Sequence, residues 1–102
     1  MGTRAIIFVE GAPHVAIYRH LDGGPDTLLP FLEEFNEDFE KERPDDPEYK
    51  AAQLLRRSYK EDVGLDDYLG WGLVDPEEAR QTKGVFFYVL KSDGVDVEKV
   101  GL

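Results

Sequence analysis

The chain contains no cysteine, only one tryptophan, and two serines, Ser58 and Ser92. Without cysteine there can be no disulfide, thiolate zinc site, iron–sulfur cluster or cysteine nucleophile. Neither serine lies in the strand–turn–helix pattern of a hydrolase nucleophile. The glycine loops that bind nucleotide phosphates are also missing. The sequence therefore favours a protein without catalytic activity and leaves an enzyme as the alternative.

Positive charge is scarce as well. Lys and Arg number 12 against 22 Asp and Glu, which gives a formal net charge of -10. Nucleic acids and anionic membranes attract clustered positive charge, so we expect neither as a partner. No apolar run approaches the ~20 residues of a membrane span, and the first residues do not resemble a signal peptide. We therefore expect a cytoplasmic protein.

What is present is a globular composition, with 41% hydrophobic and 33% charged residues in a chain of 102. This length suits a single domain over residues 1–102. Residues 4–9 are a continuous apolar run, which is typical of a strand buried on both faces. Residues 14–20 follow a Gly-Ala-Pro turn and are expected to complete a hairpin with that strand.

Two later segments have the apolar spacing of amphipathic helices. The first has its N-cap at Asp26 or Thr27 and the second begins at Asp46-Pro47. Residues 85–91 and 95–100 form a second hairpin around Ser92-Asp93-Gly94. This order predicts an α+β fold with two layers, in which two main helices pack on a largely antiparallel four-stranded sheet. Residues 65–74 fit an irregular strand or an apolar loop.

A short motif precedes the first helix. Its residues are Tyr18, Arg19, His20, Asp22, Gly23 and Pro25. With this motif the chain resembles a family of small uncharacterised proteins from phage, bacterial and archaeal genomes. That family usually has tryptophan and tyrosine where this chain has Leu21 and Gly24. The resemblance extends to Asp46-Pro47-Glu48-Tyr49 and to the hairpin around Tyr88, and it implies no particular activity.

The same motif contains a candidate cation site. Tyr18, His20 and Asp22 share one face if the strand continues to residue 22, and His14 has the same parity. Imidazole and carboxylate groups at this spacing can bind a divalent cation or act as a base with its orienting partner. The alternative is structural: Asp22 caps the turn and His20 packs under the helix. We weigh the structural interpretation more heavily.

Acidic loop residues give a second candidate for calcium or magnesium. Four clusters stand out: Asp22 with Asp26, Asp45 with Asp46, Asp66 with Asp67, and Asp93 with Asp96. Oxygen ligands in loops suit both cations, but none of these clusters has the spacing of an EF-hand. A metal site of Asp22, Asp26 and His20 is the most specific form of this hypothesis. Solvated caps and turns are the alternative.

Aromatic residues suggest an interaction surface made of Tyr68, Trp71, Phe86 and Tyr88. Residues 85–91 are apolar at both parities, so both faces of that strand need a cover. Two helices can cover only one face. Either residues 65–74 cover the other, or a second subunit does so in a homodimer.

The sequence thus favours an interaction or accessory domain that binds a protein partner or itself. Divalent-cation binding through acidic loops is the first alternative. A small metal-assisted hydrolase around His14, His20 and Asp22 is the second. An acidic mimic of DNA is the third, although Arg56, Arg57 and Lys60 interrupt the acidic surface.

Overall fold

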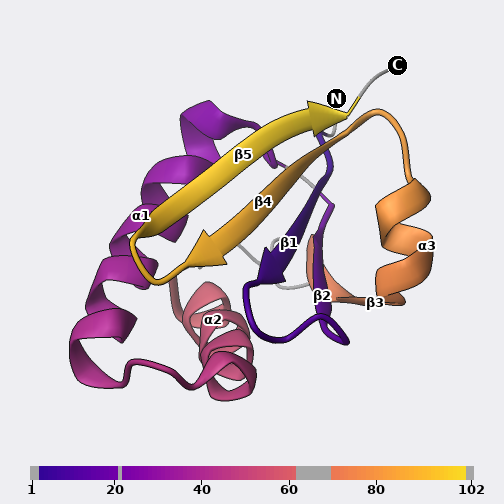
Figure 1. Ribbon diagram of the computed structural model, residues 1–102. Coiled ribbons are helices and arrows are strands. Elements are labelled where there is room, and N and C mark those ends of the chain that lie inside the picture. Colours follow the sequence, from indigo (N-terminus) through magenta and orange to yellow (C-terminus); the bar gives the residue numbers. More distant parts are fainter. Residues whose placement is uncertain (1–2, 21, 62–69, 101–102) are drawn as a thin grey trace.

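The structure is a computed structural model that describes residues 3–20, 22–61 and 70–100. In this part of the chain, five strands form one sheet and three helices pack against it (Figure 1). The strands are β1 (Ala5–Val9), β2 (Ala16–Arg19), β3 (Trp71–Val74), β4 (Val85–Lys91) and β5 (Gly94–Val100). The helices are α1 (Pro25–Glu42), α2 (Pro47–Glu61) and α3 (Pro76–Gln81). None of these helices combines the length and apolar character needed to cross a membrane.

The strands follow the order β3-β2-β1-β4-β5 across the sheet. Neighbouring strands are antiparallel except β1 and β4, which run parallel. The α+β class is therefore confirmed, but the expected sheet of four largely antiparallel strands is wrong in detail, because the sheet is mixed and has five. The difference arises from β3, which adds an edge next to β2, and from α3, which returns the chain to the far side of β1.

Local signals did identify both hairpins. β1 pairs with β2, with Ile7 opposite Ile17. β4 pairs with β5, with Lys91 opposite Gly94, so that the loop between them is two residues long. The first connection contains Gly11 and Pro13, and Gly94 follows the two-residue loop of the second, which are the turn signals that the sequence displays.

All three helices begin at a proline. Proline is well tolerated there because its missing N–H would have no partner in the first turn. The expected N-cap of the first helix is wrong by two or three residues: Gly24 holds that position rather than Asp26 or Thr27. Asp26 instead lies in the first turn, where its negative charge suits the helix dipole.

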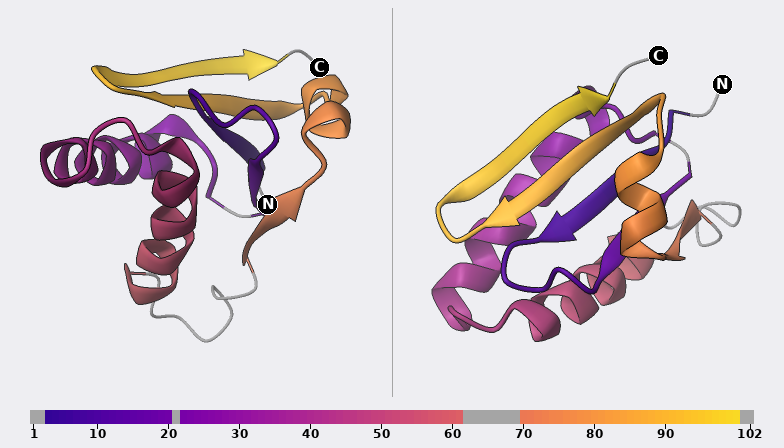
Figure 2. Two further views of the ribbon diagram at one scale, coloured as in Figure 1. Left: turned by 60° about the horizontal axis from the view of Figure 1, so that its bottom comes forward. Right: turned by 45° about the vertical axis from the view of Figure 1, so that its right-hand side comes forward.

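α1 and α2 cover one face of the sheet, which we call the closed face (Figure 2). The apolar stripe of α1, with Leu28, Leu32 and Phe35, joins one buried cluster with Ile7 and Ile17 from the strands. The prediction that the main helices pack on the sheet is therefore confirmed for α1. Tyr88 and Leu90 of β4 belong to the same cluster.

On the opposite face, which we call the open face, α3 is the one helix among residues 3–20, 22–61 and 70–100 (Figures 1 and 2). Ala79 of α3 packs on Ile6, Ala16 and Val85. The expectation that residues 65–74 supply the second cover is wrong for Trp71–Val74, which forms an edge strand, and within the described residues the cover comes from α3. A homodimer that covers the rest of this face stays a prediction. Residues 65–69 lie outside the described part.

Candidate interaction surface

The cation hypothesis begins at the end of β2. The Tyr18 hydroxyl lies 2.8 Å from Nδ1 of His20, so the two side chains form a polar pair at the surface. Asp22 has a positive φ of 55°, which turns the chain away from the strand direction. His14 and His20 flank opposite ends of β2, about 20 Å apart along an extended chain. His14 instead approaches Glu48, with 3.7 Å between Nε2 and Oε2.

The acidic clusters are dispersed in the same way. Among residues 3–20, 22–61 and 70–100, no group of three or more His, Cys, Asp or Glu side chains is placed to hold one metal ion. Asp46 pairs with Arg43, and Asp96 pairs with Lys91, each at 2.8 Å. The hydrogen bond that Lys91 donates to Asp96 raises the pKa of Lys91. Asp66 and Asp67 lie outside the described residues.

Other residues of the motif have local structural roles. The Arg19 guanidinium lies over the ring of Trp71, 4.8 Å from its centroid. A Cβ added at Gly23 would stand 2.7 Å from Cβ of Ala5 and 2.8 Å from the Thr3 carbonyl oxygen. Only glycine allows the chain to approach β1 so closely at this point.

Tyr88 ties this turn to the core. Its hydroxyl donates a hydrogen bond of 2.6 Å to the Gly23 carbonyl, and its side chain is fully buried. Burial raises the pKa of Tyr88 to about 12. The hydroxyl therefore remains a donor throughout the neutral range, and this contact joins the turn before α1 to the centre of β4.

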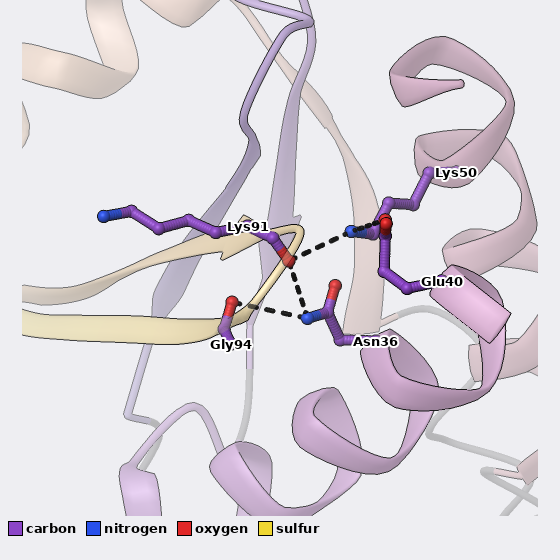
Figure 3. A network of polar contacts seen from close by, with 5 residues as sticks. All are labelled: Asn36, Glu40, Lys50, Lys91 and Gly94. Carbon is purple, nitrogen blue, oxygen red and sulfur yellow. Dashed lines mark hydrogen bonds and ion pairs between the residues drawn. The ribbon is translucent and has the colours of Figure 1, made fainter. Parts of the chain in front are cut away.

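A second set of polar contacts lies where the β4–β5 hairpin meets α1 and α2 (Figure 3). The Lys50 ammonium is 2.7 Å from Oε2 of Glu40, with side-chain exposures of 4% and 18%. The Asn36 amide donates to the carbonyl oxygens of Lys91 and Gly94. These contacts clamp the hairpin turn to both helices. Sequence reasoning missed this set, because a lysine buried by packing looks the same in sequence as an exposed one.

The aromatic residues expected to form an interaction surface are mostly enclosed. Tyr88 and Trp71 are buried in the cluster of the closed face, and Phe86 packs against it. Tyr68 lies outside the described residues. The three described residues therefore belong to the core beneath the helices, and a contact surface must be sought among the residues of opposite parity.

The residues of β1 and β4 with the opposite parity form a shallow trough on the open face, beside α3. Phe8 and Phe87 stack with 5.9 Å between their ring centroids. Val89 adjoins them and is only partly buried. Two adjacent hollows, of about 260 Å³ on the side of Phe8 and about 460 Å³ on the side of β5, share Val89 in their lining. We call this surface, lined by Phe8, Phe87, Val89, Glu10 and Glu98, the trough.

Charged groups surround the trough unevenly. The Arg80 guanidinium lies 4.8 Å from the Phe8 ring centroid and donates a hydrogen bond to the Pro13 carbonyl. The Lys91 ammonium forms an ion pair with Asp96. Glu98 makes no ion pair with any described residue, and Glu10 lies near enough to Lys91 to help raise its pKa. The lining is therefore acidic on the side of β5, whereas Arg80 keeps a positive charge on the side of α3.

Comparisons with family models, with curated proteins and with solved structures found no match for this chain.

Proposed function

We propose that this domain is a non-catalytic interaction module and that the trough on the open face is its contact surface. The observation that carries the proposal is the contrast along β4. Tyr88 and Leu90 are fully buried under two long helices, whereas on the other side Phe87 and Val89 are partly buried and the one described helix is the short α3. Apolar side chains left partly exposed and rimmed by charge mark interaction sites on soluble domains.

The polar groups support this assignment in a second way. The Ser58 hydroxyl is buried and donates to the Leu55 carbonyl. His14 and His20 lie at opposite ends of β2. Lys50 pairs with Glu40 and donates to the Lys91 carbonyl of the hairpin. Each of these reactive side-chain types has a local structural partner or stands apart from the others, which favours binding over catalysis. Cation binding near Asp22 is the alternative.

The contact surface can be tested without a partner by adding small amounts of isopropanol to isotopically labelled protein and recording its amide NMR spectrum. Small organic solvents collect where apolar side chains are exposed and rimmed by polar groups. We expect the largest amide NMR shifts at Phe8, Phe87 and Val89. Shifts concentrated between α1 and α2, or spread evenly over the surface, would contradict the proposed surface.

A further inference from the structure

We infer that the trough receives an amphipathic helix from a partner protein, with an apolar stripe against the trough floor and lysines or arginines on its flanks. This inference rests on the proposed function and names the chemistry of the partner. Three properties of the open face carry it: the width left beside α3, the apolar floor and the charge of the rim.

The width fits one helix. α3 packs on Ile6 of β1, Ala16 of β2 and Val85 of β4, so it covers the open face where β1 and β4 begin. Beside it, the two hollows extend from Phe8 on β1 across Val89 on β4 to Glu98 on β5, three neighbouring strands of the sheet. Two strand spacings of about 4.8 Å give a width of about 10 Å, and a helix has a diameter of about 10 Å. A second helix can therefore lie beside α3 and complete the layer.

The floor supplies apolar contact. Phe8, Phe87 and Val89 come from adjacent strands, with Phe8 opposite Val89 in the parallel register. A helix that presents apolar residues at positions i, i+3, i+4 and i+7 offers a stripe along its length, which is the common way a helix fills an apolar groove. Burial of the partly exposed rings and of Val89 then drives association.

The rim selects a basic helix. Glu98 on β5 has no ion pair within the described part of the chain, and Asp96 beside it neutralises Lys91, so the rim is acidic on the side of β5. Arg80 keeps its positive charge at the opposite end, next to Phe8 and α3. The chain as a whole carries a formal charge of -10. A cationic partner is therefore attracted at long range and finds carboxylates to pair with at the rim.

The same charges disfavour a second copy of the chain. Two copies facing each other would bring together rims with unpaired carboxylates on two bodies of charge -10. Edge-to-edge pairing is disfavoured in another way, because the outer strand β5 carries Asp96, Glu98 and Lys99. A basic helix from another protein avoids both difficulties.

The experiment uses a synthetic helix of leucine and lysine, about 15 residues long, with all leucines on one stripe. Two further peptides serve as controls: one of the same composition in scrambled order, and one with glutamate in place of lysine. Binding to the full chain is measured by fluorescence anisotropy of the labelled peptides at low and high salt. We expect the striped lysine peptide to bind more tightly than both controls, and to weaken as salt is raised.

Two pairs of variants locate the site. Val89→Lys should weaken binding about tenfold or more, because it replaces apolar contact with a charge of the peptide's own sign. Its control is Leu73→Lys on β3, since Leu73 is 66% exposed but lies far from the trough. Glu98→Lys should weaken binding severalfold and reduce its salt dependence. Its control is Glu33→Lys, which makes the same charge change on the exposed side of α1. Both controls should bind as the original chain does.

Any of three results would overturn the inference. They are equal binding of the scrambled or the glutamate peptide, equal loss from the control variants, and sedimentation of the chain as a dimer that Val89→Lys dissociates. The last would assign the trough to a second copy. Chemical denaturation checks that each variant is folded. If Val89→Lys does not fold, Glu98→Lys on the outer strand still tests the site. Isopropanol shifts on the trough without peptide binding would reject the helix and retain the contact surface, whereas absent shifts would reject both.

Discussion

The two faces of the sheet receive very different covers from one chain. Helices of 18 and 15 residues lie on the closed face, whereas a helix of six residues lies on the open face. Strand β4 contributes large apolar residues to both. The closed face therefore supplies the continuous core that stabilises the fold, and the open face keeps apolar surface that the fold itself does not need to bury.

The largest expected effect tests this contrast directly. Phe35 on α1 is almost completely buried in the closed face, so Phe35→Ala should lower the free energy of unfolding by about 3–5 kcal/mol. Phe87→Ala on the open face should cost only about 1–2 kcal/mol, because its ring is already partly exposed and leaves a smaller cavity. The midpoints of guanidinium denaturation measure both values.

Either of two outcomes would break the comparison. An unchanged midpoint for Phe35→Ala would contradict the packing of α1 on the sheet. Equal losses for Phe35→Ala and Phe87→Ala would mean that the open face is as fully packed in solution as the closed one. In the second case the trough would lose its standing as a contact surface.

Two neighbouring glycines, Gly23 and Gly24, test how closely the turn before α1 approaches β1. Gly23→Ala should cost about 2–3 kcal/mol, since the new methyl group would stand 2.7 Å from Cβ of Ala5 and meet the backbone of Arg4 at 2.8 Å. Gly24→Ala is the matched control, because the nearest atoms there are 3.9 and 4.0 Å away. Thermal denaturation should separate the two variants clearly, and equal midpoints would contradict the close approach of this turn to β1.

Tyr88 gives the closed face a pH dependence. Its hydroxyl has a pKa of about 12 in the folded chain against 10.0 for an ordinary tyrosine. Between these values the unfolded chain releases the phenol proton and the folded chain keeps it, so stability contributed by this group falls as pH rises from about 10. Above both pKa values, the free energy of unfolding is lower by about 2–3 kcal/mol for a shift of this size.

Tyr88→Phe isolates that contribution. At neutral pH it should cost about 1–2 kcal/mol, because the Gly23 carbonyl loses its buried donor. Urea denaturation measures the free energy of unfolding at about pH 9 and about pH 11. The decrease between these two pH values should be smaller for Tyr88→Phe than for the original chain. An identical pH dependence in both proteins would show that other groups cause it.

Sequence patterns predicted the parts of this fold that depend on neighbours along the chain. The Asp93-Gly94 turn, the start of α2 at Asp46-Pro47 and the stripe of α1 all act over a few residues. The parallel pairing of β1 with β4 could not be predicted in that way, because it joins segments about 80 residues apart and leaves no mark in local periodicity.

The contact surface shows the same limit. The apolar parity of Phe87 and Val89 was visible in the sequence, and it correctly indicated a second face that needed a cover. Which parity faces the long helices was not visible, since Phe86 and Tyr88 alternate with them just as regularly. The α3 helix also escaped prediction as a cover, because it packs through Ala79, a small residue with little signal of its own.

The smallest expected effect concerns Asp22, which lies at the end of β2. Its positive φ of 55° is a backbone role that asparagine performs equally well, and no hydrogen bond of its carboxylate is found within the described residues. Asp22→Asn should therefore change the free energy of unfolding by less than about 0.5 kcal/mol. Melting curves with and without calcium or magnesium provide the sharper measurement. If the original chain melts higher with either cation and Asp22→Asn abolishes that rise while the metal-free curves coincide, then Asp22 is a ligand. The acidic surface would then serve cations at this turn as well as a basic helix at the trough.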